Sequence, residues 1–315
     1  MHDLLGLPID ASVHGEQIDQ IIVILHWLML VLFVGWGSFF VYSLFRFRKK
    51  KNPQADYIGV RSHASSYIEV AVALFEGLLL VGFAIPVWSN VWTKYPAEKD
   101  AVVIHVVAEQ FAWNIHYPGR DGVFGKRDIK LVTSDNPLGL DRSDPNAKDD
   151  ITTINQLHIP VGKPILIYLT SKDVIHSFAL PLLRVKQDAI PGERIPITFT
   201  VTMTTNDIRE KLKKTFALEQ GHIPPRLTTM IAAASYTAAD GATILAKGDP
   251  ITEDALNQLL AAGVKSIEAT QDTPTEIACA QLCGLGHYRM RGTLVLDTPE
   301  EFQKWLEEEV QYLEQ

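Results

Sequence analysis

The residues of this chain best suited to bind a transition metal lie in one short segment near the C-terminus. Cys279 and Cys283, the only two cysteines among 315 residues, are followed by His287 and Met290. Thiolate, imidazole and thioether donors favour copper over hard cations such as magnesium. The segment therefore predicts a copper site.

Other interpretations of the two cysteines account for less of this segment. A disulfide across three residues would close a small, strained loop and leave His287 and Met290 without a role. Met is a poor zinc ligand, and a mononuclear blue-copper site needs only one Cys. Two thiolates can instead bridge two copper ions. We favour this dinuclear, electron-transferring centre, with a disulfide or inert cysteines as the alternatives.

A dinuclear site needs another nitrogen donor, and the segment Asp173-Val174-Ile175-His176-Ser177 offers one. With this segment and the Cys-x3-Cys-x3-His-x2-Met loop, the chain resembles subunit II of haem-copper cytochrome c oxidases, which holds the dinuclear copper centre called CuA. The resemblance implies the full ligand set: bridging thiolates of Cys279 and Cys283, imidazoles of His176 and His287, the thioether of Met290 and the backbone carbonyl of Gln281.

The resemblance also implies a role. Such a subunit takes single electrons from cytochrome c and passes them to haem in the catalytic haem-copper subunit I, which reduces oxygen and pumps protons alongside other oxidase subunits. The chain would thus be subunit II of an enzyme whose oxygen chemistry resides in a partner. Two alternatives are a CuA subunit of a nitric or nitrous oxide reductase type of complex, and a copper-binding assembly protein.

Two long apolar stretches predict a membrane anchor. The expected helices, at about residues 21–46 and 67–92, are long enough to cross the roughly 30 Å hydrocarbon core, and they form a transmembrane hairpin over residues 21–96. The cluster Arg46-Phe47-Arg48-Lys49-Lys50-Lys51 separates them. Because positive loops stay in the cytoplasm, we expect both termini, the segment 1–20 and the copper domain to be extracytoplasmic.

The net charge bears on possible partners. A formal charge of −8 argues against a nucleic-acid partner and suits a cationic protein donor. Asp141, Asp144, Asp149 and Asp150 are candidates for steering such a donor.

After residue 97 the sequence predicts an all-β domain. Six short runs rich in Val, Ile, Thr and aromatic residues indicate a Greek-key sandwich: residues 101–108, 111–117, 153–159, 164–170, 195–203 and 292–296. The resemblance implies a cupredoxin domain over residues 97–315. Residues 204–276 are a long insertion, in which we expect a helix over 206–218 and a small subdomain that covers the domain or docks a partner.

Several other residues draw a role from the resemblance. Glu69 matches the entrance of a proton channel. Glu76 departs from the family, in which many relatives carry proline at this position, and as an ionisable group at membrane depth it is expected at a subunit interface. Phe111 stands where relatives carry the tryptophan that receives electrons, and Trp113 is the next aromatic residue. Asp188 and Arg194 are expected at the contact with the catalytic subunit. Gln281 replaces a glutamate that reaches a boundary magnesium ion, so the expectation of magnesium is weakened here.

Overall fold

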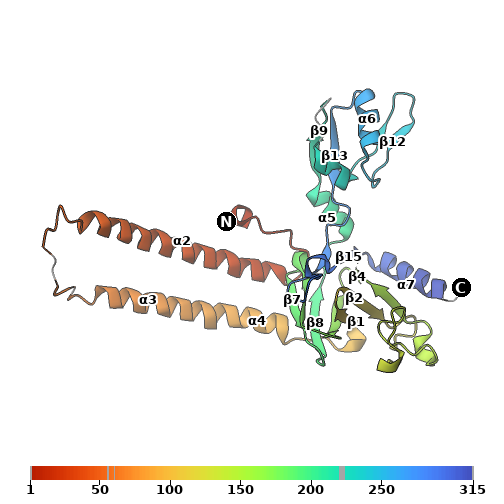
Figure 1. Ribbon diagram of the computed structural model, residues 1–315, viewed down its shortest axis with the longest axis horizontal. Coiled ribbons are helices and arrows are strands. Elements are labelled where there is room, and N and C mark those ends of the chain that lie inside the picture. Colours follow the sequence, from red (N-terminus) through yellow and green to blue (C-terminus); the bar gives the residue numbers. More distant parts are fainter. Residues whose placement is uncertain (1, 55–56, 60, 220–223, 314–315) are drawn as a thin grey trace. The chain divides into compact units, whose positions relative to one another are not determined.

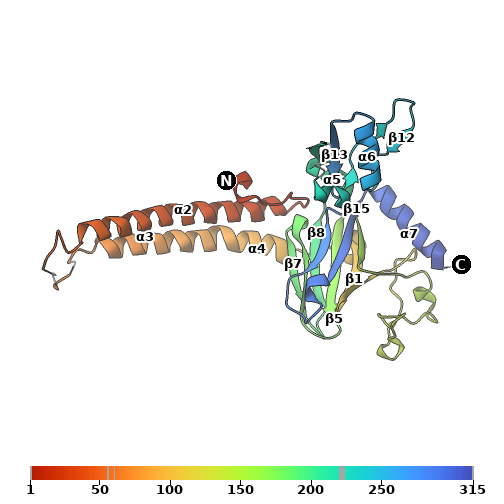
Figure 2. The ribbon, with the colours of Figure 1, turned by 45° about the horizontal axis from the view of Figure 1, so that its top comes forward.

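The computed structural model describes residues 2–54, 57–59, 61–219 and 224–313 (Figure 1). The chain forms two compact units, one of residues 1–8 and 14–94 and the other of residues 9–13 and 95–315. The first unit is helical. The second consists mainly of β-strands (Figure 2).

The helical unit is an antiparallel pair. Its elements are α1 (His2–Leu5), α2 (Gly15–Arg46), α3 (Ala64–Leu79), a π-helical turn at Leu80–Ala84 and α4 (Ile85–Trp92). The continuous helical stretches Gly15–Arg46 and Ala64–Trp92 are 32 and 29 residues long, and the most apolar part of each has none of its residues buried within the chain. A core helix of a soluble protein would be covered, so these helices fit a membrane as their apolar surroundings.

Both helices begin earlier than the apolar stretches that predicted them. Gly15 and Ala64 precede the predicted starts by six and three residues, because polar residues extend each helix beyond the hydrocarbon span. At 1.5 Å per residue, α2 is about 48 Å long. The two helices meet along a groove of aliphatic and aromatic side chains that includes Leu28, Val72 and Phe75.

The second unit is built around two five-stranded sheets. One has the strand order β3-β2-β1-β5-β8 and the other β4-β15-β14-β6-β7, with β1–β5 and β15–β4 parallel and the remaining pairs antiparallel. The first sheet contains β1 (Val102–Glu109), β2 (Ala112–Tyr117), β3 (Ile151–Ile154), β5 (Pro164–Ser171) and β8 (Ile195–Thr200). The second contains β4 (Gln156–Pro160), β6 (His176–Leu180), β7 (Val185–Ala189), β14 (Glu276–Cys279) and β15 (Arg291–Asp297). The predicted fold class, a membrane hairpin followed by a β-sandwich, is confirmed.

One predicted strand is divided between the two sheets. The run 153–159 is interrupted at Asn155, which has φ of 58°, a conformation that Asn tolerates better than most residues. The Asn155 side chain accepts a hydrogen bond from the Trp113 backbone N at 2.8 Å. This turn places β3 in one sheet and β4 in the other, so the single predicted strand is two.

The core of the sandwich lies between the sheets and extends beneath the C-terminal helix α7 (Pro299–Leu313). Trp113 and Phe178 meet edge to face with ring centroids 5.3 Å apart. From α7, the Trp305 ring stacks on His158 at 4.1 Å, and His158 Nδ1 lies 2.8 Å from Asp297 Oδ2. These contacts attach α7 to the sandwich.

The insertion between β8 and β14 has a core of its own. It contains α5 (Thr205–Leu212), β9 (Lys214–Ala217), β10 (Ile231–Ala232), β11 (Tyr236–Thr237), β12 (Thr243–Leu245), α6 (Glu253–Ala261) and β13 (Ser266–Thr270). A separate apolar cluster draws on residues between 216 and 269, with Leu256, Leu259 and Ile267 at its centre. The helix expected over 206–218 ends at Leu212, because Lys214–Ala217 pairs with β13 instead.

Candidate metal centre

The predicted ligands converge at one end of the sandwich. His176 is the first residue of β6, Cys279 is the last residue of β14, and Met290 directly precedes β15. Strands β14 and β6 are hydrogen-bonded neighbours, with Cys279 opposite Phe178. The sheet therefore sets the distance between the histidine segment and the cysteine loop, although 103 residues separate them in sequence.

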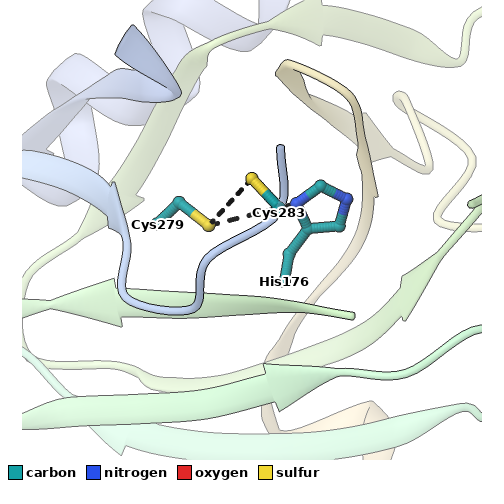
Figure 3. A group of neighbouring side chains, drawn as sticks. All are labelled: His176, Cys279 and Cys283. Atoms are coloured by element: carbon teal, nitrogen blue, oxygen red, sulfur yellow. Dashed lines mark hydrogen bonds between the residues drawn. The ribbon is translucent and has the colours of Figure 1, made fainter. Parts of the chain in front are cut away.

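The donor atoms form a compact group. Cys279 Sγ and Cys283 Sγ are 3.8 Å apart, Cys279 Sγ lies 3.9 Å from His176 Nδ1, and Cys283 Sγ lies 3.6 Å from His287 Nδ1. Met290 Sδ is 3.8 Å from Cys283 Sγ, and the Gln281 carbonyl oxygen is 3.2 Å from Cys279 Sγ. Figure 3 shows His176 and the two cysteines turned toward one another.

These separations suit a shared metal better than a covalent bond. A disulfide would need an S–S distance of about 2.0 Å, whereas both thiols are free. Two ligands on one tetrahedral ion, with bonds of about 2.3 Å to sulfur and 2.0 Å to nitrogen, lie about 3.5–3.8 Å apart. With the sulfurs in the middle and one imidazole on each side, the donor set fits a soft metal such as copper.

His176 is held in place by a carboxylate. Its Nε2 lies 2.8 Å from Asp173 Oδ1, which leaves Nδ1 directed at the cysteines. Asp173 also accepts hydrogen bonds from the backbone N of Gln110 at 2.7 Å and of Val174 at 2.7 Å. Partial burial alone would raise the pKa of Asp173, but these bonds outweigh it and hold the pKa below its usual range. The carboxylate is thus ionised and fixes the imidazole tautomer, as is common around metal-bound histidines.

The β1–β2 turn supports the cysteine loop. Gln110 Nε2 donates a 2.6 Å hydrogen bond to the Cys283 carbonyl. Next to it, the Phe111 ring packs on the loop glycines, where a β-carbon at Gly284 or Gly286 would approach the ring to 3.2 Å or 2.3 Å. Glycine at both positions therefore allows this close approach. One turn braces both the histidine segment, through Asp173, and the cysteine loop.

The site is largely closed to water. His176, Cys283 and Met290 are buried, whereas Cys279 and His287 are partly exposed. Burial, followed by the neighbouring Cys279 thiol, raises the pKa of Cys283 to about 11. Without metal this thiol keeps its proton at neutral pH, so metal binding must displace it.

The other predicted site residues lie outside this donor group. Trp113 is fully buried, with its ring centroid 6.3 Å from that of His176. Asp188 is exposed on β7 opposite Ser177, and the Arg194 guanidinium stacks 3.4 Å above the Tyr168 ring. Glu69 and Glu76 are both exposed on α3.

The acidic residues suggested for steering have different surroundings. Asp150 is fully buried 2.6 Å from His116 Nε2, so it cannot contact a donor protein. Asp149 and Asp144 accept backbone hydrogen bonds from Arg120 and Lys126 within their own loop. The steering role expected for Asp150 is therefore wrong, because this residue is buried in the domain beside His116.

Two supporting residues were not predicted from the sequence. Asp173 was recognised only as part of a motif, although its i, i+3 spacing from His176 could have indicated a hydrogen-bonded pair. Gln110 forms hydrogen bonds with Asp173 and Cys283, which are 63 and 173 residues away in the sequence. No local sequence pattern predicts contacts over such separations.

The chain matches known proteins along most of its length. A family model described as "Cytochrome C oxidase subunit II, periplasmic domain" matches residues 102–207. The alternative cytochrome c oxidase subunit 2 of Bradyrhizobium diazoefficiens is 26% identical over 293 residues, covering 93% of this chain and 80% of the relative. Cytochrome c oxidase subunit 2 of Cyanidium caldarium is 31% identical over 183 residues, covering 57% of this chain and 67% of the relative.

A solved structure of a cytochrome oxidase subunit II domain also aligns with this chain. The periplasmic domain of subunit II of cytochrome oxidase of Bradyrhizobium japonicum is 20% identical, with a TM-score of 0.35, and the match covers 70% of this chain and 99% of that one.

The fold and the site together define a class. A β-sandwich that carries soft metal donors on the loops at one end, preceded by two membrane helices, is a membrane-anchored cupredoxin. The chain belongs to the cytochrome c oxidase subunit II family. It is therefore a subunit of a terminal oxidase complex, anchored in the membrane and carrying an extracytoplasmic domain.

Proposed function

We propose that this chain is the electron-entry subunit of its oxidase and that its cysteine loop holds a dinuclear CuA centre. The observation that carries the proposal is the convergence of the six donors. Cys279 and Cys283 would bridge the two ions, with His176 and Met290 among the outer ligands. When bound, such a pair supplies one-electron chemistry with its charge shared across both metals.

The chain supports rapid electron transfer by keeping its donor atoms fixed. Asp173 and Gln110 fix the histidine segment and the cysteine loop to the same turn, so the ligands need little rearrangement when the charge of the site changes. Burial of Cys283 and Met290 limits contact with water. A preorganised, dry site reduces the cost of reorganisation.

The remaining assignments follow from the family and the surface positions. The electron donor is a cytochrome c that contacts the region of Phe111. Electrons enter through Phe111 and the buried Trp113, whose ring lies beside that of His176. Electrons then pass to haem in the catalytic haem-copper subunit, where Asp188 and Arg194 form part of the contact. A boundary magnesium ion is not part of the proposal, because Gln281 offers an amide in place of a carboxylate.

The membrane arrangement is also proposed. Arg46, Arg48 and the lysines at 49–51 lie at the end of α2 and in the following turn. Because positively charged loops stay in the cytoplasm, this cluster supports a cytoplasmic position for the turn. Both termini and the sandwich are then extracytoplasmic. Glu69, near the cytoplasmic end of α3, would lie at the entrance of a proton channel into the catalytic subunit, and Glu76 would face the same subunit.

The decisive experiment measures the metal in the purified oxidase that contains this chain. We expect two copper ions per chain in addition to those of the catalytic subunit, and a seven-line electron paramagnetic resonance signal from a mixed-valence pair. Replacing Cys283 with Ser should abolish that signal. One copper per chain, or a four-line signal in the wild-type protein, would overturn the proposal.

A further inference from the structure

The cysteine loop exposes unusually large apolar side chains between its metal donors. Leu282 and Tyr288 are 78% and 80% exposed, and Leu285 is 99% exposed. Leu282 directly precedes Cys283, Tyr288 directly follows His287, and Leu285 lies between these two donors, two residues from each. The donors point inward, so the intervening residues must point outward.

This exposure is fixed by the loop conformation. Leu285 lies between Gly284 and Gly286, both of which are packed against the Phe111 ring. The loop is further held by the hydrogen bond from Gln110 to Cys283. Leu285 therefore cannot turn into the core without breaking these contacts, and its apolar surface stays in water unless a partner covers it.

The adjoining histidine segment adds further apolar surface. Val174 and Ile175, directly before His176, are 38% and 46% exposed. We call these residues together the apolar rim: Val174, Ile175, Leu282, Leu285 and Tyr288. Two segments bearing metal donors contribute to it, so a protein that covers the rim lies close to the metal centre.

Charged groups beside the rim are largely paired within the chain. The Glu109 carboxylate forms an ion pair with Lys172, and Asp173 is committed to His176. On the two strands that flank the cysteine loop, Glu276 of β14 pairs with Arg291 of β15 at 3.0 Å. Arg289, inside the cysteine loop, has its guanidinium carbon 6.0 Å from the Phe111 ring centroid. These residues form no acidic ring that would attract a basic partner, and Arg289 adds a positive charge.

We propose that the apolar rim is the docking surface for the electron donor, and that this donor is a small redox protein whose cofactor edge is surrounded by uncharged, apolar side chains. The inference rests on the proposed function, because it needs a redox centre beneath the rim. It differs from the expectation, drawn from net charge, of a basic donor steered by acidic residues. Burial of the rim holds the complex together, and charge attraction contributes little.

The first test uses the purified oxidase and two matched donors. One is a cytochrome c whose haem edge is ringed by lysines, and the other is the same cytochrome with those lysines replaced by glutamine. We expect the neutral donor to give a kcat/KM at least equal to that of its parent. Its kcat/KM should change less than about twofold between 10 and 200 mM salt, although the Debye length falls from about 30 Å to below 10 Å over that range.

The second test uses variants of the rim. Leu285→Ser and Tyr288→Ser should each raise KM for the neutral donor about tenfold, with kcat and copper content close to wild type, because they remove apolar area from the docked complex. Tyr312→Ser is the matched control, since Tyr312 on α7 is also a tyrosine and is 75% exposed. This control should leave KM unchanged.

The outcomes separate the inference from the proposed function. A wild-type oxidase without the copper pair, or without cytochrome oxidation, contradicts the proposed function itself. An active, copper-loaded oxidase that prefers the lysine-ringed donor more than tenfold at low salt overturns only the inference. So does an unchanged KM in the rim variants, or loss of the catalytic subunit from Leu285→Ser preparations, which would show that the rim is a subunit contact.

Discussion

The Phe111 ring and Gly286 lie in such close contact that a β-carbon on Gly286 would come within 2.3 Å of Phe111 Cδ2. Gly286 has φ of −90°, a value open to any residue, so glycine is required here by space alone. The contact joins the β1–β2 turn to the cysteine loop directly before His287. The position of one metal donor thus depends on an aromatic residue outside the metal-binding motifs.

Gly286→Ala should therefore disturb the site through Phe111. The added methyl group must displace either the ring or the loop, and overpacking of this kind costs about 1–3 kcal/mol. We expect weaker copper retention and a broadened visible spectrum. Copper retained by the purified oxidase after dialysis against a chelator measures the effect.

The double variant Gly286→Ala, Phe111→Leu is the matched control. A smaller side chain at Phe111 makes room for the methyl group, so copper retention should recover part of the loss. If the double variant is as defective as Gly286→Ala alone, the contact with Phe111 is not the cause.

Asp173→Asn should weaken metal binding although Asp173 is not a ligand. Asparagine keeps the size of the side chain but removes the charge that fixes the His176 tautomer through the 2.8 Å contact. Losing such a partner lowers metal affinity about 10–100-fold. Competition with a copper chelator, followed by absorption of the oxidase, gives this number.

Asp188→Asn provides the comparison for Asp173→Asn. It neutralises an exposed carboxylate on the neighbouring strand β7, where Asp188 lies opposite Ser177 and Ala189 lies opposite His176. Its copper affinity should equal that of the wild type. Equal losses in both variants would indicate a general effect of charge rather than positioning of the imidazole.

The cysteines, His287 and Met290 could be singled out from the sequence because spacing in a loop is local information, and the resemblance added His176 and Gln281 to the predicted donors. Cys279 to Met290 could be recognised within twelve residues, and His176 within a short motif. The apolar helices were predictable for the same reason. The supports of the site were not, because Gln110 and Phe111 reach the loop only through the pairing of β1 with β2 and the packing of the two sheets. Similarly, the division at Asn155 depends on a tertiary hydrogen bond to Trp113.

The insertion should unfold locally without loss of the metal centre. Leu256 is fully buried in the separate cluster of residues 216–269, and Leu→Ala in such a core costs about 2–5 kcal/mol. We expect Leu256→Ala to expose the insertion to limited proteolysis while the copper signal of the oxidase persists. Loss of copper together with cleavage would show that the insertion and the sandwich fold as one cooperative unit.

The pH dependence of stability should report on His105, which is remote in sequence from the metal donors. Its ring stacks on Phe124 at a centroid distance of 3.8 Å, and both ring nitrogens are buried without a hydrogen-bond partner among the described residues. Burial, followed by electrostatic interaction with Arg127, His116 and Arg194, lowers the pKa of His105 to about 3. In the folded protein the ring thus stays neutral through the mildly acidic range.

The sign of the effect follows from this depressed pKa. In the unfolded chain His105 takes up a proton below about pH 6.5, whereas the folded protein does so only near pH 3. Between these values the unfolded state binds more protons, so stability falls as the pH is lowered, by up to about 1.4 kcal/mol per pH unit from this group. His105→Phe removes the titration and keeps an aromatic ring against Phe124. Thermal unfolding of the full chain in detergent at pH 7.5 and 5.5 should show a drop in Tm about 2–4 °C smaller for the variant, and an equal drop in both proteins would contradict the assignment.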